Sequence, residues 1–395
     1  MRQVGFKLVV LTGMGSIVLA ACGGSSNSSS SSSGPINVGV VAPISGSLAD
    51  AGTDIVNAAQ LAASQANASG GVLGRQIQIV PEDDQCDAQV GVQAAQRLLT
   101  ENITAIVGGY CSGSAIPESD ILHRNGDLPF IGASPSNVTF TDRGYDNTYR
   151  MIGRDDWEGP ATAAYMKSVL KATKVAIIDD NSDFSVGLAK AAGAAFTSNG
   201  GQVVFTDALS TGQNDYTAEL AKVATFNPDV FYYTGLYPEF ALIAKDYAAV
   251  SPTYKLLGGG SDIDPGVVKV AGNSLQNTNI SWVTSAFTKF DAGASAFTNA
   301  YETKFGRTPG DVSVFEYDGM KALIAALKAA GSTSASAVNS ALHKISFSGL
   351  TGTVSFDSKG DRSAYRYLGA QYKAGNFVAV ANSVGSGSNW TWTAT

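Results

Sequence analysis

Two periodicities alternate along most of the chain. Short β-branched runs are followed by Ala-rich segments in which apolar residues recur every three or four positions. The first pattern is typical of buried strands and the second of helices that bury one face. We expect strands at residues 36–42, 75–80, 104–107 and 128–131, and helices at 53–68, 88–101 and 114–123. Strands separated by helices of this length indicate βαβ units and a parallel sheet.

The same alternation then starts again. Expected strands lie at 174–179, 202–205, 230–233, 254–257 and 280–283, and expected helices at 161–170, 186–198, 216–225 and 238–249. Helices at 295–305 and 312–330 and strands at 353–356, 365–372 and 377–380 follow. Two successive runs without a low-complexity linker predict two closely joined α/β lobes with a cleft between them. Ligands of open α/β sheets bind beyond the carboxyl ends of the strands, so the loops there are the candidate site.

The first residues have the layout of a signal peptide. Arg2 and Lys7 precede an uncharged apolar stretch over residues 8–21, which is too short for a spanning helix. The tetrapeptide ending at Cys22 resembles the bacterial lipobox, in which the Cys is diacylated. Residues 22–35 form a Ser-rich tether. We therefore expect signal peptide 1–21 and a lipoprotein anchored at Cys22, in the periplasm or on the outer face of the cytoplasmic membrane. An ordinary secretory signal is the alternative.

Composition narrows the classes of function. The 395 residues are 44% hydrophobic and 15% charged, which favours well-packed domains over disorder. The formal charge of −7 argues against nucleic acid as a partner. Three Cys and two His are too few for a zinc or iron–sulfur site, and we expect neither metal nor cofactor. A small molecule is the expected partner.

The cysteines point to a disulfide. With Cys22 acylated, Cys86 and Cys111 are the remaining thiols in an oxidising compartment, and we expect them to pair. Two buried free thiols are the alternative.

Hydroxyl-rich loops follow two successive strands of the first run. Ser112 opens the helix after the third strand, and Ser134 and Ser136 follow the fourth. The amides of a first helical turn, together with hydroxyls, suit a carboxylate. Simple helix capping by Ser112 or Ser114 is the alternative.

Further candidates lie at strand ends and at the change from one run to the next. Asp262 or Asp264, in the loop after residues 254–257, can accept hydrogen bonds from an ammonium group, whereas the alternative role is turn formation before Pro265. Aromatic candidates for an apolar pocket, which core packing also explains, are Tyr110, Trp157, Phe184 and Tyr237.

Catalytic groups are hard to find. Ser185 lies in a stretch that approaches a nucleophile elbow but has Asp183 where the first Gly belongs. His123 and His343, the candidate bases, fall in expected helices. We therefore expect no enzyme; a secreted hydrolase using Ser185 is the alternative from another class.

Several short motifs carry a family resemblance. They are INVGVVAPISG at 36–46, DDQCD at 83–87, CSGS at 111–114, RGY at 143–145, EGPATAA at 158–164 and YYTGLYPE at 232–239. Together they resemble the leucine/isoleucine/valine-binding proteins of ABC importers, which are type I periplasmic binding proteins. The likeness spans nearly the whole chain after the tether, and the Cys pair matches the family's disulfide.

The resemblance implies a fold and a set of site residues. The fold is α/β, with two doubly wound parallel-sheet lobes joined by three crossover segments, closing around an amino acid. The ligand's carboxylate and ammonium would be held by Ser112, Ser134 and Ser136. A family Glu that binds the ammonium falls here on Gly260, and Asp262 is its expected substitute.

The implied function is that of a substrate-binding lipoprotein of an ABC importer, working with a permease and its ATPase. Its ligand would be a small carboxylate, foremost a branched-chain or other apolar amino acid. Family Tyr residues become Ala51 and Phe184 here, and Leu236 beside Tyr237, which opens the choice of ligand. The alternative within the fold is a lipoprotein that senses an amide or aromatic carboxylate for a signalling partner. We expect residues 36–154 and 284–361 in lobe 1, and 155–283 and 362–395 in lobe 2.

Overall fold

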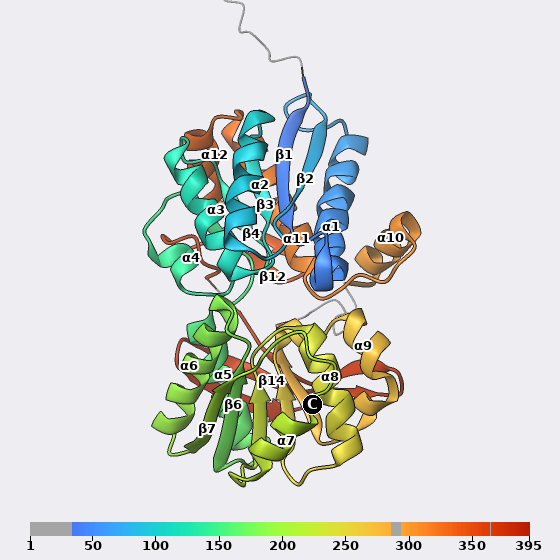
Figure 1. The fold of residues 1–395 in the computed structure, drawn as a ribbon. Helices are drawn as coiled ribbons and strands as arrows, with labels where there is room; N and C mark the ends of the chain where they lie inside the picture. The colour runs from blue at the N-terminus through green and yellow to red at the C-terminus, as the bar shows by residue number, and fades with distance from the viewer. Residues whose placement is uncertain (1–33, 286–293, 364) are drawn as a thin grey trace, which may run out of the picture. The chain divides into compact units, whose positions relative to one another are not determined.

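The computed structural model describes residues 34–285, 294–363 and 365–395. The expected signal peptide, Cys22, most of the tether and residues 286–293 lie outside the described residues. Within them, two sheets carry the fold, and each has its own layer of helices on both faces (Figure 1). None of the helices in these ranges is long and apolar enough to cross a membrane.

Lobe 1 is built on a five-stranded parallel sheet of order β2-β1-β3-β4-β5. Its strands are β1 (Ile36–Ala42), β2 (Ile77–Asp83), β3 (Ala105–Gly108), β4 (Phe130–Gly132) and β5 (Thr148–Arg150). β1 and β3 are buried almost throughout, because helices cover both faces of the sheet. Those helices are α1 (Ala49–Ala68), α2 (Ala88–Thr100), α3 (Ser112–Arg124), α4 (Thr139–Asp142), α10 (Ser295–Phe305), α11 (Ser313–Ala330) and α12 (Ala335–Leu342). A hairpin of β11 (Phe347–Gly349) and β12 (Gly352–Val354) completes the lobe.

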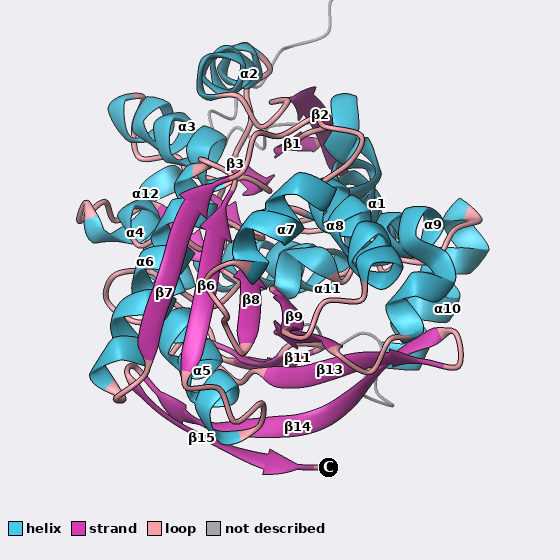
Figure 2. Cartoon of the chain, turned by 60° about the horizontal axis from the view of Figure 1, so that its bottom comes forward, coloured by secondary structure: helices cyan, strands magenta, loops and turns pink. Residues whose placement is uncertain are grey.

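Lobe 2 is built on an eight-stranded sheet of order β15-β14-β13-β10-β9-β8-β6-β7. Five strands run parallel: β6 (Lys174–Asp179), β7 (Gln202–Ala208), β8 (Val230–Tyr233), β9 (Lys255–Gly258) and β10 (Ile280–Thr284). Three antiparallel strands extend the sheet: β13 (Leu368–Lys373), β14 (Asn376–Ser386) and β15 (Asn389–Ala394). The second sheet is therefore mainly parallel, with three antiparallel strands at one edge (Figure 2).

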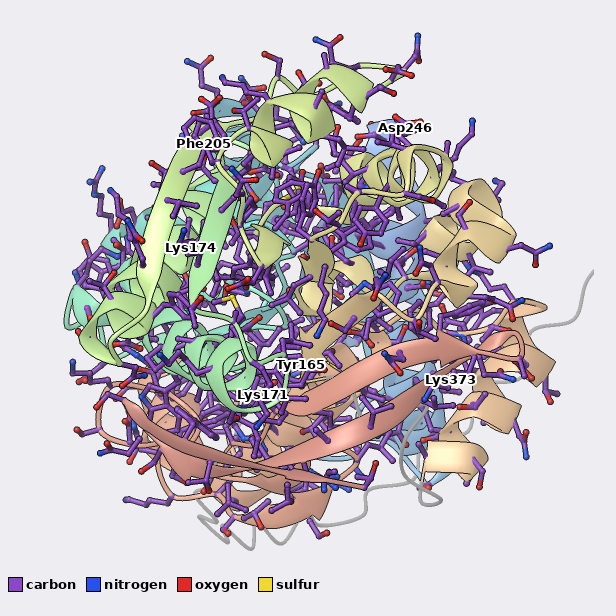
Figure 3. All side chains as sticks on the ribbon, turned by 90° about the horizontal axis from the view of Figure 1, so that it is seen from below. Tyr165, Lys171, Lys174, Phe205, Asp246 and Lys373 are labelled. Carbon is purple, nitrogen blue, oxygen red and sulfur yellow. A yellow bond between two sulfur atoms is a disulfide. The ribbon has the colours of Figure 1, made fainter. Side chains whose placement is uncertain are left out.

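Helices cover the second sheet as they cover the first. They are α5 (Asp155–Ser168), α6 (Asp183–Ser198), α7 (Thr217–Ala224), α8 (Tyr237–Val250) and α9 (Pro265–Ala271), with the short turns η2 (Gly260–Asp262) and η3 (Gly272–Gln276). Tyr165, labelled in Figure 3, lies where α5 packs on the C-terminal strands. Its ring meets Trp392 edge-on with centroids 4.9 Å apart, so the last strand helps to hold α5 in place.

The chain passes between the lobes after β5, after β10 and after β12. The carboxyl ends of β3 and β4 in lobe 1 and of β6, β8 and β9 in lobe 2 lead into the loops that line the site described next.

Candidate ligand-binding site

A cavity of about 570 Å³ lies between the two lobes and takes its walls from both. This volume is in the range of small-molecule sites. Its apolar lining is Leu48, Tyr110, Ile152, Phe184, Leu236, Val312 and Phe315. Its hydroxyl and carboxyl lining includes Ser112, Ser134, Ser136, Glu158, Asp180, Glu239, Asp264 and Asp311.

The lobe 1 wall begins with a sharp turn at the end of β3. Gly108 and Gly109 both have positive φ, and a Cβ on Gly108 would lie 2.5 Å from the Val41 carbonyl oxygen, so the turn requires glycine. The turn leads through Tyr110 and Cys111 directly into the first residue of α3. The N-terminus of a helix of this length favours a negatively charged group.

The hydroxyls of this wall converge. Ser112 is 1% exposed, and its Oγ accepts a hydrogen bond from the Asn137 amide at 3.2 Å, which joins α3 to the loop after β4. That loop carries Ser134 and Ser136, and Ser136 is 2% exposed. The structure therefore brings Ser112, Ser134 and Ser136 together on one wall of the cavity. Their hydroxyls and the start of α3 suit a carboxylate.

A disulfide supports this wall. Cys86 and Cys111 are bonded, with Cα atoms 5.3 Å apart, and both contribute to the cavity lining. The predicted pairing is thereby confirmed. The bond ties the loop before α2 to the residue that precedes Ser112.

The lobe 2 wall carries several carboxyl groups, most of which hold loops. Asp180 accepts hydrogen bonds from the amides of Ser182 and Leu236. Asp264 caps α9 by accepting from the Gly266 amide at 2.7 Å. These carboxylates fix the loops after β6, β8 and β9 around the cavity.

Glu158, another carboxyl of the lining, is buried at 4% exposed, as is Asp264. Glu158 lies in the first turns of α5. Burial, together with the nearby Asp155, raises the pKa of Glu158 to about 8, and an interaction with the Gly260 amide opposes the rise. Burial likewise raises the pKa of Asp155 to about 7, against the effects of Ser136 and Arg150.

Comparison with known proteins identifies the family. A family model described as periplasmic binding protein matches residues 35–376. The chain belongs to the periplasmic binding protein family. The Leu/Ile/Val-binding protein homolog 2 of Brucella abortus is 31% identical over 343 residues, which cover 86% of this chain and 91% of the relative.

Solved structures agree with this assignment. LivJ of Streptococcus pneumoniae, a branched-chain amino acid transporter substrate-binding protein in complex with isoleucine, is 26% identical with a TM-score of 0.79, covering 87% of this chain and 97% of its own. An ABC transporter solute-binding protein from R. palustris, in complex with benzoate, shares the fold with a TM-score of 0.81 at 22% identity, covering 88% and 96%. The expected family and two-lobe α/β fold are thus confirmed, and the family consists of non-enzymatic, extracytoplasmic solute-binding proteins.

The structure places some of the remaining predicted site residues of this periplasmic binding protein at the cavity and others away from it. Tyr110 and Phe184 line the cavity, whereas Trp157, Tyr237 and Asp262 do not. Trp157 packs partly buried against the lobe 2 core. Asp262 is fully buried in the η2 turn, where its Oδ2 accepts from the Gly259 amide at 2.8 Å. The structure therefore gives Asp262 a turn-forming contact and brings Asp264, its alternative, to the cavity wall.

Tyr237 lies at the junction of the lobes. Its hydroxyl donates to the carbonyl oxygen of Ser47 at 3.0 Å. A second contact of this kind joins the Asn137 side-chain amide to the Asp183 carbonyl at 2.7 Å. Both hydrogen bonds cross from one lobe to the other.

The position of Ser185 gives the hydrolase alternative no support. Ser185 is fully buried at the start of α6, where its hydroxyl bonds Thr234 Oγ1 at 2.9 Å and accepts from the Asp180 amide. Within residues 34–285, 294–363 and 365–395, no group of three or more His, Cys, Asp or Glu side chains is arranged to hold a metal ion.

Proposed function

We propose that this protein is the substrate-binding component of an ABC importer and that it holds a small apolar amino acid between its lobes. The observation that carries the proposal is the polarity of the cavity. Hydroxyls and the start of α3 occupy the lobe 1 wall, carboxyls occupy the lobe 2 wall, and apolar side chains lie among them. A zwitterion with an aliphatic side chain matches all three features, because each buried charge needs a partner.

The relatives support the same ligand class. The Brucella relative is a Leu/Ile/Val-binding protein homolog, and the Streptococcus structure contains isoleucine. In our proposal, the carboxylate of the amino acid binds Ser112, Ser134 and Ser136. The side chain of the amino acid packs against Phe184, Tyr110 and the other apolar residues of the lining.

We base on the sequence our proposal for how the amino acid reaches the membrane transporter. Cys22 would carry the lipid, residues 22–35 would tether the folded part, and a permease with its ATPase would receive the amino acid. We also propose the lobe limits at residues 154, 284 and 361, where the chain passes between the lobes.

Calorimetry on protein freed of co-purified ligand by unfolding and refolding tests the proposal. We expect leucine, isoleucine and valine to bind and benzoate to bind more weakly. Ser112→Ala should weaken amino-acid binding about tenfold or more, the effect of losing a hydrogen bond to a charged group. Ser114→Ala is the matched control: this hydroxyl in the same helical turn bonds Asp84 at 3.0 Å, away from the cavity. Its affinity should stay within about twofold of the wild type. Binding of benzoate without any amino acid would contradict the amino-acid assignment.

A further inference from the structure

Glu158 occupies a distinctive place in the cavity. It follows Asp155 by three residues on α5, so both carboxyls lie on the same face of the helix. The Asp155 amide donates to the Ser136 carbonyl oxygen at 3.0 Å, which holds the start of α5 against the hydroxyl-rich loop of lobe 1. Glu158, one turn further on, therefore lies near the end of the cavity where the serines gather.

The surroundings of Glu158 hold little positive charge. Among the described residues, the groups that shift its pKa are Asp155 and the Gly260 amide, and neither is a cation. Glu158 in turn raises the pKa of four neighbours: Tyr232 on β8, Asp262 in η2, and Tyr365 and Tyr367 before β13. A carboxylate buried among phenols and acids is costly unless a cation reaches it.

Three other carboxyls of the same wall accept hydrogen bonds from backbone amides of the loops around the cavity. Asp180 and Asp264 accept backbone amides of their own loops, as described above. Glu239 accepts from the Gly212 amide at 3.3 Å, at the other side of β8. Glu158 interacts with the Gly260 amide as well, but it differs from them because it lies in α5, the helix whose first amide donates to Ser136 of the serine loop.

The loop after β9 lies beside the Glu158 carboxyl. An added Cβ on Gly259 would lie 3.8 Å from Glu158 Oε1. Gly260 lines the cavity, and its amide interacts with the Glu158 carboxyl.

We propose that Glu158 is the acceptor for the ligand's ammonium group and thereby selects α-amino acids over carboxylates that lack the amine. The inference rests on the proposed function, since it assumes that the carboxylate binds at Ser112. The carboxyl comes from helix α5 and borders the cavity beside the loop after β9.

Two probes and one variant test this role by calorimetry: L-leucine, its des-amino analogue 4-methylpentanoate, and Glu158→Gln. The variant should lose about 10- to 100-fold in affinity for leucine, the range for a hydrogen bond to a charged group. Its affinity for 4-methylpentanoate should change by no more than about threefold. A merely structural role for Glu158 would weaken both probes equally, and that result would overturn the inference.

A second measurement needs no variant. The pKa of Glu158 lies at about 8, so the carboxyl is largely protonated at pH 7 and must ionise to pair with an ammonium. Calorimetry in buffers of different ionisation enthalpy should show release of close to one proton with leucine and none with 4-methylpentanoate.

The outcomes separate this inference from the proposed function. Wild-type protein that binds leucine, with unchanged leucine affinity in Glu158→Gln, overturns only the role of Glu158. Wild-type protein that binds 4-methylpentanoate but not leucine overturns this role and leaves a carboxylate receptor. Binding of neither probe, nor of the other amino acids, overturns both.

Discussion

Single residues show how an acidic protein uses buried carboxyls. Asp54 on α1 accepts from the Tyr301 hydroxyl at 2.6 Å and from the Gly310 amide at 2.9 Å, and it pairs with Arg307 at 3.2 Å. Burial nevertheless raises its pKa to about 6. Glu158 lacks such a cation, and burial raises its pKa further, to about 8. The pKa of a buried carboxyl therefore depends on whether a cation lies beside it, and titration of the folded protein measures this difference.

The pH dependence of stability follows from these shifts. The ordinary pKa of Glu158 is 4.5 and the folded value is about 8, so between these values the folded protein binds a proton that the unfolded chain has released. Stability from this group is present at low pH and is lost as pH rises. Without ligand, the free energy of unfolding of the wild type should fall, relative to Glu158→Gln, by on the order of 1 kcal/mol per pH unit from pH 5 to 8.

Urea unfolding across that pH range measures the effect. Glu101→Gln, which alters an exposed carboxyl at the end of α2, is the control and should follow the wild-type curve. Parallel curves for the wild type and Glu158→Gln would show that Glu158 is ionised in the empty protein.

At the scale of elements, the start of α3 depends on a turn far from it in sequence. Gln85 and Cys86 both adopt left-handed backbone conformations just before α2. Asp84 accepts the Cys86 amide at 3.0 Å and the Ser114 hydroxyl of α3 at 3.0 Å. The disulfide holds the loop and the helix as one unit, and Ser112 directly follows its second cysteine.

Removing the disulfide should loosen that unit. Cys86→Ser with Cys111→Ser opens a loop of 25 residues and should lower the free energy of unfolding by about 3.5 kcal/mol. Leucine affinity should also fall, because the first turn of α3 loses its anchor. Denaturant unfolding and calorimetry measure both effects, and wild-type protein in reductant should behave like the double variant. An unfolding midpoint that reductant does not move would contradict this expectation.

The helices and strands also show how much of the fold the sequence alone predicts. The strands predicted at 36–42 and 174–179 coincide with β1 and β6, because their apolar runs are local signals. Strand β5 was missed because it has three residues and ends in Arg150, a buried cation whose partner Asp361 is distant in sequence. Helix α12 and strand β15 were missed as well.

The same limit applies to the site. The serines follow strand ends, where parallel sheets bind ligands, and this signal led sequence reasoning to residues that line the cavity. Glu158 was missed as an individual candidate because its position inside a helix gives no sign that it borders Gly260. Asp262 was the more visible choice, since it lies in the loop. Its burial in the η2 turn depends on packing that local sequence does not encode.

At the scale of the whole molecule, a network of buried ion pairs holds crossover segments together at one side of the cavity. Arg150, at the end of β5, pairs with Asp361 at 2.7 Å, and Arg154, before α5, pairs with the same carboxylate at 2.6 Å. The first and third crossovers are thereby linked to each other. Relative motion of the lobes is then expected as a hinge about this side, with the largest displacement at the opposite rim of the cavity.

Hydrogen bonds from one lobe to the other should therefore affect the balance between open and closed protein. The Tyr237 hydroxyl bonds Ser47 across the lobes but does not line the cavity, so Tyr237→Phe should favour the open form without altering ligand contacts. We expect leucine affinity to fall about 2- to 10-fold, the effect of one neutral hydrogen bond, mainly through faster dissociation. Tyr254→Phe is the matched control, since that hydroxyl bonds the Leu220 carbonyl within lobe 2 at 2.9 Å. It should lower stability and leave affinity unchanged.

Stopped-flow kinetics and small-angle scattering test this hinge together. Ligand should make wild-type protein more compact, because binding energy favours the form in which both lobes touch the same molecule. Saturated Tyr237→Phe should reach the same compact state, but only at higher leucine concentration, since the variant shifts the equilibrium and leaves the closed geometry intact. If Tyr237→Phe and Tyr254→Phe lose affinity equally, the effect comes from lost stability of lobe 2 rather than from closure. If ligand leaves the scattering of the wild type unchanged, the lobes do not move as the linked crossovers predict.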